Sequence, residues 1–345
     1  MQRPRALHVL HVPSTSALLA NDKIRLSKPE QVSGYSLHPD GRLTFDRACL
    51  KELRPAKIGA NLLDGFESHH VEPSEDASPS LQPILDAMLP ANREAHHADA
   101  HLSPPRLPAA IDVVTFRNNL NKILGTPYNS NSPYVFHVQR RGRTLFLNIQ
   151  HERDADGVMH PAQAKGAYAG RQYEAIASHG PRGEYCGVFA MLLGSTQLLV
   201  GAELDGVDGR GDYVELKTYK LLQTSKDRFS FERYKCLAFW IQSYLVGVGR
   251  IRCGFRSADC KLVKEQTFAT SQLPAFGAKY WQPNVCLSFA KLVFAWLEDK
   301  VPDDTAYEVR YDPRARALSL LALPDAKSFL PTSVGASWPN GPTTS

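Results

Sequence analysis

Short stretches of alternating hydrophobic and polar residues recur along most of this chain. Alternation with a period of two is typical of strands that bury one face, and the turn-forming residues between the stretches favour hairpins. One hairpin is predicted within residues 34–45, with its turn at residues 38–41. Further strands are predicted over residues 134–139, 144–150, 185–194, 197–205, 212–219, 250–256, 261–268, 306–311 and 317–323.

Hydrophobic residues spaced three and four positions apart predict several helices among these strands. The clearest lies over residues 229–245, and a second over residues 285–301 has Asn284 as its expected N-cap. The hydrophobic face of the first is predicted to contain Tyr234, Leu237, Ala238, Ile241 and Leu245. Weaker helical patterns cover residues 81–89, 111–124, 166–177 and part of residues 46–66. Together the elements predict an α+β fold with mixed, largely antiparallel sheets flanked by helices.

The distribution of these elements predicts one catalytic domain over residues 1–325. Residues 1–32 show little periodicity and are expected to form an N-terminal arm or edge segment, and residues 67–108 are rich in loop-forming residues. Histidines in that second segment lack the fixed spacing of metal ligands, so a solvated loop is the favoured interpretation for His69, His70, His96, His97 and His101. Residues 326–345 are rich in Pro, Ser, Thr and Gly and are predicted to be disordered.

Composition restricts the cellular setting more than the chemistry. The formal net charge of +5 is compatible with a polyanionic partner without establishing one. The six cysteines include no C-x-x-C pair, so free buried thiols in a reducing compartment are expected. Uncharged stretches are too short to cross a bilayer, and the N-terminus lacks a convincing signal peptide. An intracellular protein with no membrane association is expected, in the cytoplasm or the nucleus.

The most informative segment for chemistry is residues 201–219, with the sequence GAELDGVDGRGDYVELKTY. Residues two apart in a strand point to the same face, so Glu203 projects with Asp205, and Glu215 projects with Lys217. The glycine-rich connection between them is expected to let the two strands pair as an antiparallel hairpin. Three carboxylates and one ammonium group would then converge.

Such a cluster of carboxylates repels itself when it is removed from water, and a divalent cation relieves that repulsion. Mg²⁺ and Mn²⁺ prefer oxygen ligands, and two such ions about 4 Å apart can activate water and stabilise the leaving oxygen of a phosphodiester. Lys217 would add a positive charge beside the phosphate. Charged residues at alternate positions also occur on solvated hairpins, and the pattern alone leaves both interpretations open.

These two strand segments resemble the third and fourth motifs of the decapping exoribonuclease (DXO/Rai) family, whose core is similar to the PD-(D/E)xK nucleases. The other motifs of the family have counterparts in the same order, and the resemblance covers residues 33–322. The counterparts are FRNNLNKILGTPY at residues 116–128, AYAGRQYE at residues 167–174, FWIQSYLVGVGRIRCGFR at residues 239–256 and, upstream, LRPAKIGANLLDGFESH at residues 53–69.

The resemblance implies a role for each matched residue. The implied metal ligands are the side chains of Glu174, Glu203, Asp205 and Glu215, with the carbonyl group of Leu216. It also implies that Lys217 and Gln242 approach the scissile phosphate or the attacking water and that Arg117 contacts a substrate phosphate. By their own local patterns, Arg117 would be a surface helix charge, Gln242 a boundary polar residue and Glu174 a solvated acid.

The resemblance further implies a hydrolase of RNA 5′ ends that uses Mg²⁺ or Mn²⁺, with two ions expected. Its substrates would be single-stranded RNAs with incompletely capped, NAD-capped or phosphorylated 5′ ends, and it would release cap dinucleotides and degrade RNA in the 5′-3′ direction. The first motif departs from the family, because Asn118 follows Arg117 where glycine is usual and Phe116 precedes it where tryptophan is usual. This departure predicts weak release of pyrophosphate from triphosphorylated RNA.

Two other functions stay open at this point. The chain could be a 5′ pyrophosphohydrolase that mainly stabilises a nuclear 5′-3′ exoribonuclease, or a nuclease directed at DNA. Four basic residues are candidates for contacts to the RNA backbone, with a solvated hairpin turn as the alternative for the first three: Arg140, Arg141, Arg143 and Lys220.

Overall fold

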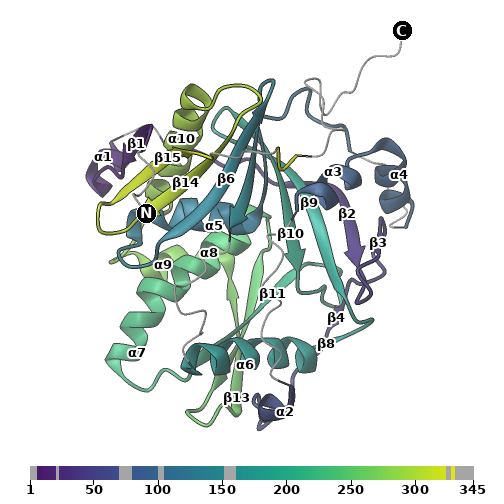
Figure 1. Ribbon diagram of the computed structural model, residues 1–345. Coiled ribbons are helices and arrows are strands. Elements are labelled where there is room, and N and C mark those ends of the chain that lie inside the picture. Colours follow the sequence, from purple (N-terminus) through teal and green to yellow (C-terminus); the bar gives the residue numbers. More distant parts are fainter. Residues whose placement is uncertain are drawn as a thin grey trace.

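The computed structural model describes residues 6–20, 23–69, 80–99, 105–150, 161–323 and 328–330. Within them, one large mixed sheet runs through the molecule, and a smaller sheet lies beside it (Figure 1). The strands of the large sheet, in spatial order, are β1 (His8–His11), β15 (Ala317–Ala322), β14 (Ala306–Asp312), β6 (Tyr134–Arg141), β7 (Thr144–Gln150), β5 (Val113–Phe116), β10 (Thr196–Leu204), β9 (Glu184–Leu193), β2 (Glu30–Leu37) and β3 (Leu43–Thr44). Most neighbours pair antiparallel, but β5 pairs parallel with both β7 and β10.

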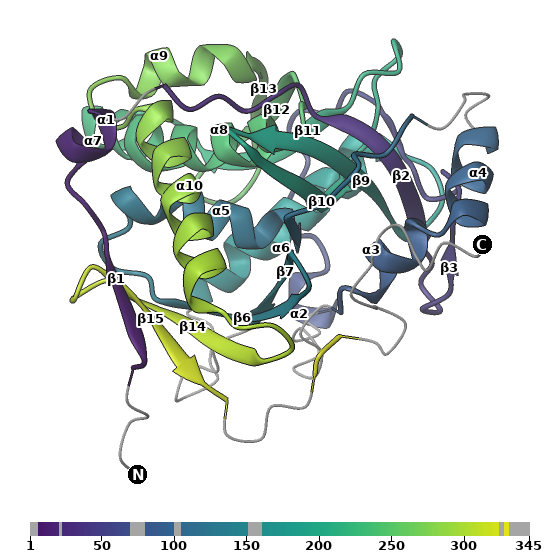
Figure 2. The ribbon, with the colours of Figure 1, turned by 90° about the horizontal axis from the view of Figure 1, so that it is seen from above.

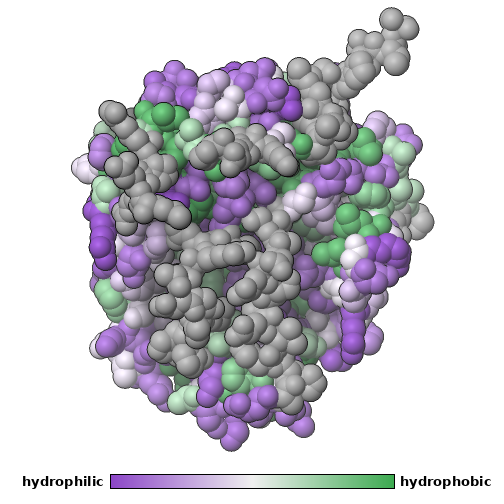
Figure 3. All heavy atoms as spheres, in the orientation of Figure 1, coloured by the Kyte–Doolittle hydropathy of each residue, from purple (hydrophilic) through white to green (hydrophobic). Residues whose placement is uncertain are grey.

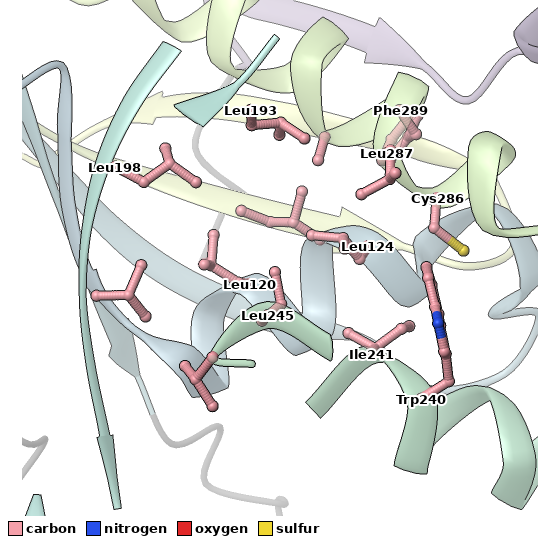
Figure 4. Packing of buried hydrophobic residues seen from close by; sticks show 14 of the residues in the cluster. Leu120, Leu124, Leu193, Leu198, Trp240, Ile241, Leu245, Cys286, Leu287 and Phe289 are labelled. Atoms are coloured by element: carbon pink, nitrogen blue, oxygen red, sulfur yellow. The ribbon is translucent and has the colours of Figure 1, made fainter. Parts of the chain in front are cut away.

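Helices cover both faces of the large sheet. On one face, α5 (Arg117–Gly125), α8 (Cys236–Leu245) and α10 (Pro283–Lys300) pack together (Figure 2). Their contact region is a hydrophobic cluster to which α5 contributes Leu120 and Leu124, and α8 contributes Trp240 and Ile241 (Figure 4). The opposite face carries a second cluster beneath α3 (Gln82–Ala87), which includes Ile84. Burial of these apolar faces is the main force holding the helices on the sheet.

The smaller sheet consists of β11 (Val214–Lys220), β12 (Arg250–Arg256) and β13 (Leu262–Ala269), with β11 at its edge. β11 is parallel to β12, and β12 is antiparallel to β13. One face packs against α6 (Pro161–Ala177) through Tyr173 and Leu216, while Cys253 and Phe255 on the other face join the cluster around α8. Side chains of β11 therefore alternate between the side of α6 and the side of α8.

The predicted helix over residues 111–124 is wrong in its first part, because β5 occupies Val113–Phe116 before α5 begins. Val113 and Val114 are buried on opposite faces of the large sheet, between two parallel neighbours. Short apolar runs that are buried on both faces lack a helical or alternating signature, and valine favours strands. The predicted hairpin over residues 34–45 is confirmed as β2 and β3, with Gly41 at a φ of 82° in the turn.

The helix predicted over residues 229–245 is interrupted by a π-helical turn. It begins as α7 (Ser225–Ser230), passes through the π turn at Phe231–Lys235 and continues as α8. The wider turn changes the phase of the helix, so the prediction that Tyr234 and Ala238 face the core is wrong, and both are exposed. The expected N-cap of the helix at residues 285–301 is also wrong: Gln282 holds the N-cap position of α10 without a side-chain cap hydrogen bond, and the Asn284 side chain accepts a hydrogen bond from the Ile24 amide (3.1 Å).

Two expectations for the first third of the chain need correction. The predicted short helix within residues 46–66 is absent from residues 46–65, which instead contain β4 (Glu52–Leu53) paired with β8 (Ser178–His179), and α2 (Phe66–His69) begins only at the end of the segment. In the loop-rich segment, α4 (Pro90–Asp99) carries His96 and His97 into the interior, so the solvated-loop interpretation is wrong for both.

Several smaller outcomes complete the picture. The His69 side chain, His70 and His101 lie outside the described residues. All six cysteines are buried and free, as predicted. Within the described part of the chain, no helix is long and apolar enough to cross a membrane. Among the residues coloured by hydropathy in Figure 3, hydrophilic side chains predominate and hydrophobic ones form separate patches.

Most of the tail from residue 326, including residues 331–345, lies outside the described residues, but residues 328–330 pack against the large sheet. Leu330 is 5% exposed within the second cluster, and the Ser328 hydroxyl donates a hydrogen bond to Gln139 (3.1 Å). Truncation before residue 328 is therefore expected to lower the free energy of unfolding by about 2 kcal/mol relative to truncation after residue 330, because a buried leucine is lost. Urea unfolding of the two truncated chains measures this difference, and equal midpoints would contradict it.

Candidate active site

Two strands of the large sheet place the first polar residues of the candidate site. Since β5 and β10 are parallel and Gly201 lies opposite Phe116, their C-terminal ends meet at the same edge of the sheet. Arg117 begins α5 directly after β5, and Glu203 lies near the end of β10, with Asp205 just beyond it. The Arg117 guanidinium donates a hydrogen bond to the backbone carbonyl of Glu203 (2.9 Å), which ties the two strand ends together.

Glu215 lies at the centre of the site and is 1% exposed. Its carboxylate is held by Lys217 Nζ (2.6 Å) and by Arg117 Nη1 (3.1 Å), and the Gln242 side-chain amide donates to it from α8. Glu215 and Lys217 are two positions apart on β11, so both side chains lie on the face of the strand toward α8. A carboxylate with these donors can stay ionised away from water, because two positive charges compensate it.

The predicted antiparallel pairing between the strands of Glu203 and Glu215 is confirmed only at a bridge between Val207 and Tyr213, because β10 belongs to the large sheet and β11 to the small one. The connection instead bends sharply, and the backbone amide of Leu216 donates to Asp205 Oδ2 (2.5 Å). Gly206 in this bend has a φ of 157°, and a Cβ there would lie 2.6 Å from the Lys51 carbonyl oxygen. The carboxylates still gather, but they do so across the junction of two sheets.

Three further carboxyl groups of the site retain their protons unusually strongly. Burial, and then repulsion from Asp205, raises the pKa of Glu174 on α6 to about 7. Glu203 opens onto a pocket yet lies deep within the surrounding protein, and this removal from bulk water, followed by repulsion from Glu184, raises its pKa to about 7. For Asp205, burial and then repulsion from Glu215 raise the pKa to about 7.

Glu215 behaves differently from these three acids. Burial alone would raise its pKa, but the charges of Lys217 and Arg117 outweigh burial and lower it. Burial would likewise lower the pKa of Lys217, and the charges of Glu215 and Asp205 outweigh that effect and raise it. The site therefore combines an ionised centre with three surrounding carboxyl groups that lack sufficient positive charge.

A divalent cation fits the chemistry of this donor set, which consists of carboxylate and carbonyl oxygens. Among the residues that the structure describes, no three Asp, Glu, His or Cys side chains are arranged closely enough to hold an ion as they stand. Asp205 and Glu215 turn their oxygens toward protein donors. Binding of a cation would therefore require these oxygens to exchange some of their N–H partners for the ion.

A pocket of about 690 Å³ opens beside the cluster. Its floor is the face of β2, β9 and β10 that carries Tyr35, Cys186 and Glu203. The remaining lining residues come from the β2–β3 hairpin, α3, α5 and α8, and include Asn118 at the N-terminal turn of α5 and Gln242. A pocket of this size accommodates a nucleotide-sized ligand directly beside the carboxylates.

A protein-family model described as "RAI1 like PD-(D/E)XK nuclease" matches residues 27–334. The chain belongs to this nuclease family. The "Decapping and exoribonuclease protein" of Xenopus laevis is 29% identical over 309 residues, which cover 80% of this chain and 77% of that protein. The match confirms the predicted family and the α+β fold with a PD-(D/E)XK-type core.

Solved structures of family members show the same fold. Candida albicans Rai1 in complex with pU5-Mn²⁺ superposes with a TM-score of 0.74 at 21% identity, covering 92% of this chain and 93% of that chain. Scheffersomyces stipitis Rai1 in complex with (3′-NADP)⁺ and calcium superposes with a TM-score of 0.72 at 21% identity, covering 87% and 91% of the two chains. Divalent cations and 5′ nucleotide ligands are thus bound by proteins of this fold.

The structure brings all the side chains predicted for the site into one region. The metal-ligand roles of Glu174, Glu203, Asp205, Glu215 and the Leu216 carbonyl stay predictions, as do the roles of the remaining residues, Arg117, Lys217 and Gln242. Arg117 differs from its local pattern, because it is buried rather than a surface helix charge. Its position predicts an additional task, namely to hold Glu215.

The expected contacts of the basic β6–β7 turn to RNA stay a prediction, and its arginines are engaged with protein groups away from the carboxylates. Arg143 pairs with Asp112 at the start of β5, whereas Arg117 follows the end of that strand, about 15 Å away. Arg141 pairs with Asp304, and Arg140 donates to backbone carbonyls near the end of α10. Lys220 pairs with Asp227.

Sequence reasoning missed Glu184 and Tyr35, which enter the site only because β2 and β9 become its floor.

Proposed function

We propose that this chain is a metal-dependent phosphodiester hydrolase that acts on the 5′ ends of single-stranded RNA. It would remove incomplete or NAD-type caps, release a cap dinucleotide and degrade RNA in the 5′-3′ direction, with residues 1–325 acting as one catalytic domain. The observation that carries the proposal is the ionised Glu215 beside three carboxyl groups with raised pKa values, next to a nucleotide-sized pocket. Such a cluster is costly for folding and indicates a functional site.

Cation binding would involve the carboxylates of Glu174, Glu203, Asp205 and Glu215, with the Leu216 carbonyl. A bound Mg²⁺ or Mn²⁺ supplies an acidified water and neutralises charge on the phosphate. Two ions are proposed, as in other enzymes that stabilise both the attacking and the leaving oxygen. Family members bound to manganese and to calcium support the choice of a hard cation.

The protein groups around Glu215 have separate tasks in this proposal. Lys217 is one-fifth exposed, so its ammonium group can turn from Glu215 toward a phosphate oxygen that arrives at the site. The Gln242 amide, already a donor beside Glu215, would orient the attacking water. Arg117 would hold the carboxylate in place and, at the start of α5, lend its charge to a phosphate near the pocket.

Where the 5′ end sits relative to the cluster would decide which bond breaks. A cap nucleoside in the pocket would place the phosphodiester that follows the first transcribed nucleotide at the carboxylates, and a cap dinucleotide would leave. An RNA with a 5′ monophosphate would lose its first nucleotides instead. The pU5 and (3′-NADP)⁺ ligands of the two Rai1 structures support both kinds of 5′ end.

The test is an incubation of the full chain with Mn²⁺ and RNAs that differ only at the 5′ end. The 5′ ends are an unmethylated cap, an NAD cap, a triphosphate and a monophosphate, and products are resolved by length and by released nucleotide. Release of a cap dinucleotide with shortening of the monophosphate RNA is the expected result. Absence of product from every RNA would reject the enzymatic proposal and favour a role as partner of a separate nuclear 5′-3′ exoribonuclease.

Asn118 provides a prediction on 5′-end selectivity. Its side chain is exposed on the pocket wall, in the first turn of α5, where backbone N–H groups can bind phosphate. Asn118→Gly is expected to increase pyrophosphate release from triphosphorylated RNA several-fold, because more phosphate oxygens can reach those N–H groups. Quantifying released pyrophosphate measures the effect. Asn121→Gly, in the same pocket but one turn later, is the matched control, and an equal gain in both variants would contradict the explanation.

A further inference from the structure

The exposed side of α7, the π turn and α8 carries aromatic and cationic side chains that the proposed catalytic groups do not use. In the π turn, the Arg233 guanidinium lies over two rings, 5.6 Å from the Phe229 centroid and 5.3 Å from the Tyr234 centroid. Tyr234 is 52% exposed and Phe229 is 38% exposed. Exposed large hydrophobic side chains that gather in one patch mark interaction sites.

This surface continues directly into the candidate active site. Helical spacing aligns Lys235, Ala238 and Gln242 along one side of α8, and the exposed Ala238 leaves that side open between the two longer residues. On the edge strand β11, Tyr219 shares a face with Lys217, and the Lys235 ammonium lies 5.9 Å from the Tyr219 ring. The helix rises about 10 Å between Gln242 and Lys235, and the strand extends about 13 Å between Glu215 and Tyr219. The two elements therefore run side by side from the site to the contact between Lys235 and Tyr219.

We infer that Tyr219, Phe229, Arg233, Tyr234 and Lys235 form a track that binds single-stranded RNA on the 3′ side of the scissile phosphate. This inference rests on the proposed function of the adjacent site. By helical rise, the track extends about 20 Å from Gln242 to Phe229, which is enough for several nucleotides. The helices α7 and α8 that carry most of it follow one another in Figure 1. Bases stack on aromatic faces without regard to sequence, and cations between the rings neutralise phosphates.

The charge of the surface favours RNA over a protein partner. Residues 226–235 contain four basic and two acidic residues, and one of the acids, Asp227, pairs with Lys220. Lys226 and Arg228 are exposed beside Phe229, and Lys279 is exposed next to Tyr280, whose ring lies 5.2 Å from that of Phe229. The centres of protein–protein interfaces are depleted of lysine, whereas channels for single strands combine lysine and arginine with aromatic residues.

The experiment compares the double variant Arg233→Ser, Tyr234→Ser with the unaltered chain on 5′-monophosphate RNAs of about 3 and about 15 nucleotides, which bracket typical sites for single strands. The kcat/KM on the long RNA is expected to fall about tenfold relative to that on the short RNA, through KM, because the variant removes one ring on which a base stacks and one cation beside it. Lys57→Ser, Ile58→Ser is the matched control, since this exposed cation and hydrophobic residue lie beside the outer strand β13 of the small sheet and do not belong to the track.

Binding of the same RNAs, followed by fluorescence anisotropy in EDTA, separates the track from catalysis. The double variant is expected to lose affinity for the long RNA and to show a salt dependence that is weaker by about one phosphate contact. An unchanged ratio between the long and short RNAs, or an equal loss for both, would overturn the track. If the unaltered chain cleaves neither RNA, the proposed function fails, and the anisotropy measurement still decides whether the track binds RNA.

Discussion

Glu215→Gln is expected to reduce RNA hydrolysis by at least about 10²-fold while the chain still folds. Glu215 has the most donors of any acid in the site, with Lys217, Arg117 and Gln242 all directed at its carboxylate. The amide keeps the size of the side chain but removes the negative charge that a cation would need. Initial rates on monophosphate RNA with Mn²⁺ measure the loss. Asp205→Asn is expected to act in the same direction, because its carboxylate adjoins the same cluster.

The choice of glutamine rather than alanine follows from the burial of this residue. Removing the side chain would leave Arg117 and Lys217 without their shared counter-charge, which costs about 3–5 kcal/mol when a buried pair is broken. An inactive Glu215→Ala chain could simply be unfolded. Glu308→Gln, which alters a partly exposed acid paired with Arg310 on the far strand β14, is the matched control and should retain full activity. Full activity in both Glu215→Gln and Asp205→Asn would reject the site.

Removal of divalent cations is expected to abolish hydrolysis, and cation affinity is expected to increase from pH 6 to pH 8. The pKa values of Glu174, Glu203 and Asp205 are raised to about 7, so at pH 6 these groups hold protons that a cation must displace. At pH 8 they are ionised and repel one another, and a cation relieves that repulsion. Titration with Mn²⁺ at each pH, followed by calorimetry and by activity after EDTA treatment, measures both effects.

The same groups predict how stability depends on pH when no cation is added. Their folded-state pKa values lie above the unfolded values of about 4, so the folded chain holds more protons between these limits. Their contribution to stability therefore falls as pH rises from about 4 to 7. The same concentration of Mn²⁺ should raise the melting temperature more at pH 8 than at pH 6, because the Kd for the cation is lower at pH 8. A ligand at about 100 times its Kd adds about 2.7 kcal/mol to the free energy of unfolding. Turnover in EDTA, or cation binding that weakens with rising pH, would contradict the mechanism.

Local periodicity was sufficient to identify most strands and the face that each acid of the site occupies. Glu203 and Asp205, like Glu215 and Lys217, project together because strand side chains repeat every two residues, and this holds in any sheet. The order of the motifs was sufficient to identify the nuclease family, which the family model confirms. These features depend on residues that are close together in the chain, and they can therefore be predicted from the amino-acid sequence.

The tertiary structure decided how those local pieces meet. The sequence predicted a hairpin between the strands of Glu203 and Glu215, yet their pairing is limited to the bridge between Val207 and Tyr213, and the two strands belong to separate sheets that pack in different hydrophobic clusters. The local sequence likewise did not predict strand β5 or the burial of the histidines of α4, since both depend on contacts with distant segments. Glu215 keeps its charge beside its strand neighbour Lys217 and beside Arg117, which lies 98 positions earlier, while Gln242 donates to it from a separate helix. Sequence therefore determined which groups this protein could use, and only the packing of distant elements decided which of them share one charge environment.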